Sequence, residues 1–487
     1  MEQKKSPHPQ WALECKRKGT ELRLINGRYY LYGVSSKWDP VKKRSRKISG
    51  KILGSISEKE GFVESEKHRL RQRQIKVERA EVKEFGVTEA IEKLFAETLQ
   101  PLKEHFPDAW QQLVCLAYGR LLYCSPLKNM FFHYSHSYLS QEYPNLDLSA
   151  KTLGAFLNEV GASRGKIVDF CRSFKSAQDN ILFDGTDLVS NSEKMELPKL
   201  SRCKNGTYND IINLMCVFST AQHMPLYYRL LPGNIKDVSA FKTSLLESGV
   251  DDAIVIVDKG FASECNIAAL EAGKLHYIVA LRRDSTLINY AKIKESGKRA
   301  LDGYFQYEGR YVWHYSGVIS EGKKVVVFLD EELRIREQRD YLDRIQSHAE
   351  NYSVEDFHEK QHVFGTFAVL ENTGKSASEV YAAYKMRMEV ETMIDTLKNV
   401  LDADRTYMQN QQTLEGWMFV NLIALKWYYI LLNLLKKHNL NAKYSPMDML
   451  MMLAEIKKVK INNDWFDAEI THKTRLLLQT LGIRNIT

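Results

Sequence analysis

The apolar positions between residues 181 and 281 form short runs separated by amphipathic stretches. Runs of strand length alternate with segments whose apolar residues recur at three- and four-residue spacing. This alternation predicts a mixed α/β core in which the fourth strand lies parallel to the first. Strands are expected at 181–183, 211–219, 226–231, 253–257 and 276–281, and helices at 239–248 and 263–273.

The segments on either side of this core have patterns of their own. Near the N-terminus, apolar runs flank Asn26-Gly27, a dipeptide typical of a two-residue β-hairpin turn, and residues 58–80 have a helical pattern. After residue 284, short β-like runs return and predict an insertion into the core. The expected organisation is a basic N-terminal module at 1–85, a helical region at 86–176, an α/β core at 177–284 and 363–410, a β-rich insertion at 285–362, and a C-terminal helical region at 411–487.

Charge is distributed unevenly along the 487-residue chain, whose formal net charge is +8. The first 80 residues carry 21 Lys and Arg against 9 Asp and Glu, a net of +12, so the remainder sums to −4. Such asymmetry favours a module that binds polyanions, although a solvated basic face would have the same composition. The densest basic run lies beside Trp38, which suits contacts with phosphates and bases. Its cations are Lys42, Lys43, Arg44, Arg46 and Lys47.

Composition disfavours two other classes of protein. None of the seven cysteines belongs to a C-x-x-C pair, which argues against a zinc ribbon or a disulfide scaffold and favours a reducing cytoplasm. The stretch 417–435 is apolar enough to suggest a membrane span, but it contains Asn421, Lys426 and Asn433. A buried core helix is therefore the preferred interpretation, with a membrane protein as the distant alternative.

Two aspartates, Asp184 and Asp258, directly follow predicted strands, and each is followed within two residues by a glycine. A short carboxylate at a rigid strand end can hold a divalent cation, and glycine lets backbone or substrate approach closely. Aspartate is also common in ordinary turns, and Asp187 competes with Asp184 for the first position. Neither aspartate alone therefore identifies a site.

A helix is expected to begin at Ser376, which forms an S-x-x-E capping box with Glu379. Four polar side chains then recur at steps of three, four and seven, and lie within roughly 60° of arc on one face. One carboxylate, two cations and a phenol aligned in this way suit a phosphate ligand, although a solvated helix with i,i+4 salt bridges shows the same spacing. The four residues are Tyr384, Arg387, Glu391 and Lys398.

These motifs together resemble the DDE transposases of the bacterial insertion-sequence-four superfamily. Tyr384-x2-Arg387-x3-Glu391-x6-Lys398 is similar to the Y-R-E-K motif of that family, with all three gaps matched. The resemblance covers about residues 180–410, in the family's order and with a β-rich insertion before the glutamate. The other matching stretches are Leu182-Phe183-Asp184-Gly185-Thr186, Val257-Asp258-Lys259-Gly260-Phe261 and Pro232-Gly233-Asn234-x2-Asp237.

The resemblance implies a ribonuclease-H-like catalytic core and a two-metal mechanism. Asp184, Asp258 and Glu391 would be the catalytic residues and would bind two Mg²⁺ or Mn²⁺ ions. A pair of ions stabilises both the attacking and the leaving oxygen of an in-line displacement. Water or a DNA 3′-hydroxyl would then be the nucleophile, so that element ends are nicked, freed and joined to target DNA.

The resemblance also implies residues and partners that hold DNA. Tyr384, Arg387 and Lys398 would grip phosphates beside the cleaved end. Hairpin-forming relatives flip a base onto an aromatic residue of the β-rich insertion, and Trp313 is the candidate here, with a tryptophan of the sheet core as the alternative. The expected partners are double-stranded DNA, at terminal inverted repeats and at the target, and a second copy of the chain. The expected location is the bacterial cytoplasm.

Two rival functions share many of these features. A metal-dependent endonuclease would have the same core, but it has less need of the full Tyr–Arg–Glu–Lys set, which would hold a cut end. A transposase-derived DNA-binding regulator without catalysis would keep the basic module, but it would often have lost one of the three carboxylates. Transposition is therefore the preferred function.

Overall fold

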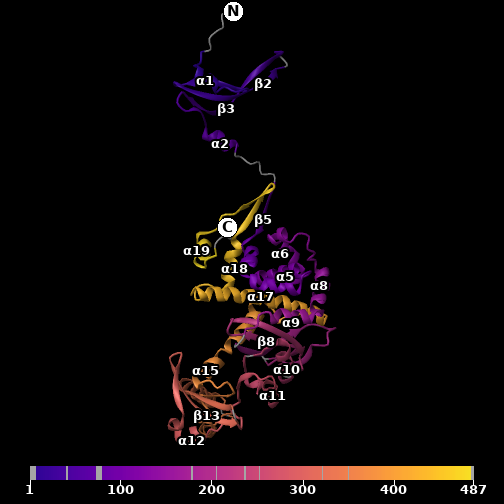
Figure 1. Cartoon of the computed structure of the whole chain (residues 1–487), viewed down its shortest axis with the longest axis vertical. Helices are drawn as coiled ribbons and strands as arrows, with labels where there is room; N and C mark the ends of the chain where they lie inside the picture. The colour runs from indigo at the N-terminus through magenta and orange to yellow at the C-terminus, as the bar shows by residue number, and fades with distance from the viewer. Residues whose placement is uncertain are drawn as a thin grey trace, which may run out of the picture. The chain divides into compact units, whose positions relative to one another are not determined.

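The computed structural model describes residues 7–39, 42–72, 79–176, 179–203, 206–234, 237–251, 253–320, 322–348 and 350–483 (Figure 1). The chain forms two compact units. The smaller unit consists of Met1–Glu81 with Lys460–Trp465, and the larger of Val82–Val459 with Phe466–Thr487.

The smaller unit contains a four-stranded antiparallel sheet in the order β1-β2-β3-β4. Asn26 and Gly27 have positive φ angles of 51° and 76° and close the β1–β2 turn, as the Asn-Gly dipeptide predicts. A small apolar core that includes Ala12, Leu31 and Ile56 holds α1 against the sheet. The elements are α1 (Gln10–Glu14), β1 (Thr20–Ile25), β2 (Arg28–Asp39), β3 (Arg44–Ser57), β4 (Gly61–Glu64) and α2 (Glu66–Gln72).

The prediction of a helix at 58–80 is wrong for the first part of this segment. Gly61–Glu64 is strand β4, because its backbone pairs with the end of β3 from Gly54↔Glu64 to Ser57↔Gly61. Helix α2 follows as the described helical part of this segment, and residues 73–78 lie outside the described residues. Tertiary pairing therefore overrides the helical periodicity at the start of the segment.

Helices from the N-terminal and C-terminal parts of the larger unit pack together, with α17 (Gln411–Lys437) on α5, α8 and strand β9. Among the described residues, α17 is the one helix long and apolar enough to span a membrane, and most of its apolar window is buried inside the protein. It is thus a buried core helix, as the sequence predicts. The other helices are α3 (Gly86–Leu94), α4 (Ala96–His105), α5 (Trp110–Tyr123), α6 (Met130–His136), α7 (Leu139–Glu142), α8 (Ala150–Ala162), α9 (Arg164–Arg172), α18 (Pro446–Glu455) and α19 (His472–Thr480).

The larger unit is organised by one mixed sheet. Its centre has the order β9-β8-β6-β10-β11, in which β9, β8 and β6 are antiparallel and β6, β10 and β11 are parallel. Three antiparallel strands followed by two parallel ones is the arrangement of a ribonuclease-H-like core, so the expected fold class is confirmed. The strands are β6 (Asn180–Ser190), β7 (Lys199–Arg202), β8 (Tyr208–Ser219), β9 (Met224–Pro232), β10 (Ile254–Val257) and β11 (His276–Ala280), with helices α10 (Asp237–Ser248) and α11 (Glu264–Ala272).

The β-rich insertion extends this sheet instead of forming a separate one. Strand β15 (Thr366–Glu371) pairs antiparallel with β11, and the insertion strands continue from it in the order β14, β13, β12. The backbone of the insertion is therefore hydrogen-bonded to the core. Its elements are α12 (Ala291–Ser296), β12 (Gly303–Tyr307), β13 (Arg310–Ser320), β14 (Lys323–Asp330), α13 (Glu331–Ser347) and α14 (Val354–Lys360).

Two small β elements complete the described fold. Strand β16 (Arg405–Thr406) pairs with the far end of β6, at Val189 and Ser190. A three-stranded sheet has the order β18-β17-β5. Its strands are β5 (Ala80–Glu84), β17 (Lys457–Ile461) and β18 (Asp464–Asp467).

Candidate active site

Asp184 lies within strand β6 and not at the strand end that the sequence predicts. Strand β6 continues past Asp184 because its antiparallel partner β8 pairs with it up to Val189, including Asp184↔Cys216. The parallel partner β10 ends earlier, at Val257↔Phe183. Asp184 is therefore the first residue of β6 beyond the parallel pairing, at the carboxyl end of β10, where open α/β sheets commonly bind ligands.

Asp258 follows the last residue of β10 and therefore emerges beside Asp184. Its Oδ1 atom accepts a hydrogen bond of 2.7 Å from the backbone N–H of Lys259 and caps the short 3₁₀ turn Lys259–Phe261. In the same way, Asp184 Oδ1 accepts a bond of 2.9 Å from the N–H of Gly185. These local hydrogen bonds hold both carboxylates at the carboxyl end of the β6–β10 parallel pair.

The segment that carries Tyr384, Arg387, Glu391 and Lys398 is not the single helix expected from its periodicity. Helix α15 (Ala377–Lys385) begins with the predicted Ser376–Glu379 capping box but ends before Arg387. A turn at residues 386–387 separates it from α16 (Met388–Asp395), which leads into the π-helix Thr396–Val400. The break lies between Tyr384 and Glu391, yet both side chains still lie in one cluster with Arg387.

The side chain of Arg387 connects two of the three carboxylates. Its Nη2 atom lies 3.4 Å from Asp258 Oδ2, and its Nη1 atom donates a hydrogen bond to Glu391 Oε1. Burial would lower the pKa of Arg387, but Asp258, Tyr384, Asp184 and Glu391 outweigh it and raise that pKa. The guanidinium therefore stays charged in the electrostatic field of all three carboxylates.

Tyr384 lies in the same cluster. Burial, followed by the negative charges of Asp258, Glu391 and Asp184, raises its pKa and keeps the phenol protonated at neutral pH, although the cation of Arg387 acts in the opposite direction. Its ring packs against Phe367, with centroids 4.4 Å apart. The Tyr384 hydroxyl is thus a hydrogen-bond donor on a ring that packs against Phe367.

Lys398 contacts β6 just beyond Asp184. Its Nζ atom is 3.0 Å from Thr186 Oγ1 and 3.5 Å from Asp187 Oδ1. Asp187, the competitor of Asp184, is therefore paired with Lys398, whereas Asp184 contributes to the field around Arg387 and Tyr384. This difference favours Asp184 as the site carboxylate.

The donor atoms suit a divalent cation, but their arrangement is not that of a closed metal site. Carboxylate oxygens are the ligands that Mg²⁺ and Mn²⁺ prefer. Among the described residues, no group of three His, Cys, Asp or Glu side chains could hold a metal ion. Arg387 pairs with Asp258 and Glu391, two of the three carboxylates expected as metal ligands.

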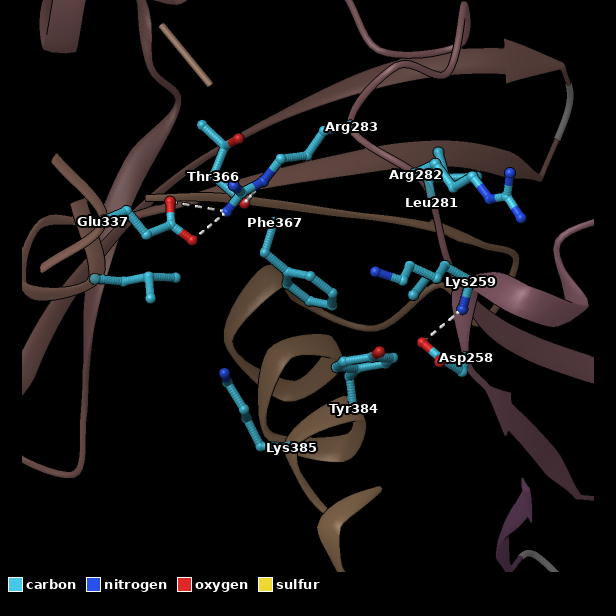
Figure 2. A pocket seen from close by; sticks show the side chains of 12 residues that line it. Asp258, Lys259, Leu281, Arg282, Arg283, Glu337, Thr366, Phe367, Tyr384 and Lys385 are labelled. Carbon is cyan, nitrogen blue, oxygen red and sulfur yellow. Dashed lines mark hydrogen bonds and ion pairs between the residues drawn. The ribbon is translucent and has the colours of Figure 1, made fainter. Parts of the chain in front are cut away.

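A cavity of about 730 Å³ opens beside Asp258 and Tyr384 (Figure 2). Figure 2 shows Lys259 pointing into it and Arg283 bonded to Glu337 at its far side. These lining cations were not predicted from the sequence, although Lys259 directly follows the second aspartate. Tyr384 and Phe367 form an apolar wall, so the cavity combines positive charge with aromatic rings, as nucleotide-binding surfaces do. The cations are Lys259, Arg282, Arg283 and Lys385.

Trp313 belongs to the outer side of the insertion and not to the sheet core. It lies opposite Tyr304 across the β12–β13 pair, with ring centroids 5.0 Å apart, and Lys298 Nζ is 5.3 Å from its ring. Tyr304 and its neighbour Tyr311 are 60% and 58% exposed. The core alternative is therefore wrong, and Trp313 is part of a half-exposed aromatic cluster with a cation beside it.

The predicted basic cluster lies in the smaller unit, on and beside strand β3. Lys42, Lys43, Arg44, Arg46 and Lys47 are all exposed. Lys47 differs from the others because it forms an ion pair with Glu21 of β1, and Lys47 together with Arg23 lowers the pKa of Glu21 to about 2. The cluster is positioned on a strand whose side chains are open to solvent.

The Pro-Gly-Asn motif has a structural explanation. A side chain on Gly233 would collide with the backbone oxygen of Ile211, so glycine permits the end of β9 to pack on β8. Asn213 donates to the carbonyl oxygens of Pro232 and Gly233 at 3.3 and 3.2 Å. Asp237, the last residue of the motif, begins α10, and its side chain lies outside the described parts of the chain.

Comparison with known proteins identifies a family and a distant likeness to a solved structure. Residues 175–427 match the family model described as "Transposase DDE domain", a little more than half of the chain. No curated protein matches the sequence. A solved structure, the piggyBac transposase synaptic complex with hairpin DNA, is 12% identical with a TM-score of 0.40, over 77% of this chain and 75% of that one. That likeness is too distant to bear on function.

Proposed function

The chain belongs to the transposases with a DDE domain, and from that premise we propose that it cuts and rejoins DNA at the ends of a bacterial insertion sequence. Membership of the insertion-sequence-four superfamily is part of the proposal and is supported by the Y-R-E-K spacing. The observation that carries it is the convergence of Asp184, Asp258 and Glu391 on Arg387 and Tyr384 at the carboxyl edge of β10.

In the proposed mechanism, Asp184, Asp258 and Glu391 would hold two Mg²⁺ or Mn²⁺ ions. When bound, such ions supply an activated nucleophile and stabilise the leaving 3′-oxygen. The protein's own residues hold the scissile strand. Arg387 turns its two-pronged guanidinium from the carboxylates to a phosphate, and the Tyr384 hydroxyl donates to a neighbouring phosphate oxygen. Strand cleavage and strand joining then use the same carboxylates.

Further cations would add phosphate contacts along the DNA. Lys398 is tethered to Thr186 and Asp187 close to the triad and is available as a point charge for a phosphate. Lys259 in the cavity is a second such charge, because it points into open space. Trp313 offers a half-exposed ring for an unstacked base, which supports a hairpin-forming mechanism.

The proposal includes partners and a location. The basic cluster of the smaller unit would bind the terminal inverted repeats of double-stranded DNA. Two copies of the chain would act as a homodimer on two element ends, because both ends must be cut and joined together. All seven cysteines are free, which suits the bacterial cytoplasm.

The test is cleavage of a labelled duplex that contains the DNA flanking the gene, with Mg²⁺, Mn²⁺ or EDTA. The wild type is compared with Glu391→Gln and with Glu389→Gln, a control on the same helix whose carboxylate is 2.8 Å from His223. We expect metal-dependent nicking at the element boundary by the wild type and the control, and none by Glu391→Gln. Specific binding without cutting would support the inactive regulator, and cutting without regard to the boundary would support a general endonuclease.

A further inference from the structure

Strands β2 and β3 continue together beyond the rest of their sheet (Figure 1). Strand β1 pairs with β2 only up to Thr20↔Gly33, and β4 pairs with β3 only from Gly54 onward. Between these limits, 34–39 and 44–49 pair only with each other among the described strands. The side chains of 35–38 and 42–50 are exposed. We call this segment, 34–39 with 44–49, the β2–β3 ribbon.

The base of the ribbon is shaped by glycine and held by an ion-pair network. The β2–β3 register shifts twice between Leu31 and Val34, and such bulges bend a strand and increase its twist. At this point a Cβ atom on Gly50 would come within 2.8 Å of the Gly33 carbonyl oxygen, so only glycine allows the close approach. Glu21 of β1 then binds Lys47 and accepts a 3.2 Å hydrogen bond from Ser49. The ribbon therefore leaves the sheet in a defined direction.

The ribbon has no apolar core of its own. A two-stranded hairpin exposed on both sides is marginally stable in water, so an ordered ribbon of this length calls for a binding partner. Residues 35–50 contain six Lys and Arg and one Asp, which makes the partner a polyanion. The six paired residues of each strand span about 20 Å at 3.3 Å per residue. The major groove of B-DNA, about 12 Å wide, accepts a two-stranded β-ribbon.

The register separates the ribbon into two unlike faces. Lys37 lies opposite Arg46, and Asp39 opposite Arg44, so these four side chains share one face. Trp38, which is 61% exposed, lies opposite Ser45 on the other face. One face thus carries two arginines, whose planar groups match the two acceptors of guanine, and the other carries an aromatic ring, small hydroxyls and Lys47.

We propose that the β2–β3 ribbon inserts into the major groove of the element-end duplex, with Arg44 and Arg46 facing the base edges. Lys42 and Lys43, which precede β3, contact phosphates at the groove edge. This proposal rests on the proposed function for the identity of the DNA. The ribbon proposal goes beyond the proposed function by assigning sequence recognition to a β-ribbon. It also separates base contacts from phosphate contacts within one basic cluster.

The experiment measures binding of the full chain to the element-end duplex and to an unrelated duplex over a range of salt concentrations. Arg44→Ala with Arg46→Ala is expected to lower the preference for the element end roughly 10- to 100-fold. The double variant Lys42→Ala with Lys43→Ala is expected to weaken binding to both duplexes alike. It should also lower the slope of log K against log salt by about 2. Lys59→Ala is the matched control, because this exposed lysine lies in the turn between β3 and β4, outside the ribbon and the basic cluster.

A second measurement needs no variant and therefore cannot fail through misfolding. Dimethyl sulfate methylates guanine N7 in the major groove and adenine N3 in the minor groove. Major-groove insertion predicts that N7 methylation within the element end blocks binding, while N3 methylation does not. Interference at adenine N3 alone, or an unchanged preference in the double arginine variant, would overturn the ribbon proposal while boundary cleavage still stood. A wild type that neither binds nor cuts would instead refute the proposed function.

Discussion

Arg387 competes with divalent cations for the carboxylates of the site, so its removal should tighten metal binding while it impairs cleavage. The guanidinium bonds Asp258 and Glu391 and stays charged in the field of Asp184. A metal ion that uses these carboxylates must first displace it. Arg387→Gln keeps a polar side chain of similar reach but removes the positive charge. The expected result is a higher affinity for Mn²⁺ and a lower rate of strand cleavage.

The size of the effect follows from the geometry. At 3.4 Å and an effective dielectric of about 20, Arg387 and Asp258 attract each other by about 5 kcal/mol before desolvation is counted. Glu391 has a half-exposed side chain, so water screens its share of the interaction. A net competition of about 1–3 kcal/mol remains, and each 1.4 kcal/mol is tenfold in affinity. We therefore expect Mn²⁺ to bind roughly 10- to 100-fold more tightly to Arg387→Gln.

Calorimetric titration measures the Mn²⁺ affinity of the variant and the wild type without DNA and without any cleavage. Arg283→Gln serves as the matched control, because Arg283 is bonded to Glu337 and not to the triad. Glu391→Gln should change the affinity in the opposite direction, since it removes a ligand. Equal or weaker Mn²⁺ binding by Arg387→Gln, alongside loss of binding in Glu391→Gln, would refute the competition.

Two further predictions concern other charges of the larger unit. Lys259→Gln should weaken binding of the element end and lower the salt slope by about 1, because Lys259 points into the cavity beside Asp258; an unchanged slope in a binding titration would exclude a phosphate contact there. Lys426 is buried with no hydrogen-bond partner for its Nζ atom in the described structure, 3.6 Å from the ring centroid of Phe174, and burial lowers its pKa from 10.5 to about 7. The folded state therefore binds fewer protons than the unfolded state between pH 7 and 10.5, and stability should rise with pH across that window. Lys426→Met should remove this pH dependence and stabilise the protein at pH 7 by roughly 2–4 kcal/mol, which is the desolvation penalty less the lost cation–π contact. Denaturant unfolding at pH 7 and pH 10 measures both effects. A variant less stable than the wild type at pH 7 would contradict this prediction.

Much of the fold could be predicted from local sequence. The order of strands and helices in the core, the parallel pairing of β10 with β6 and the Asn26-Gly27 turn all agree with the structure. So does the capping box at Ser376. Each depends on short-range preferences or on an apolar run that has to be buried, and both can be read from neighbouring residues.

The candidate site could be predicted only in part. The residues Asp184, Asp258, Arg387 and Glu391 were found by spacing and by resemblance, and the structure brings them together. The Arg387–Glu391 pair follows the i,i+4 spacing, but the contact of Arg387 with Asp258 could not be predicted, because it joins residues far apart in the chain. The cavity cations were missed because they come from separate strands and loops.

The sequence by itself determined which chemical groups the protein possesses and which local elements carry them. Tertiary structure decided where strands end and what each side chain faces. Strand β6 extends past Asp184 because β8 pairs with it, and Gly61–Glu64 is a strand because β3 supplies a partner. Hydrogen bonds between strands join residues far apart in the chain, so local periodicity does not contain them. The same long-range pairing leaves the β2–β3 ribbon uncovered and places its arginines on one face.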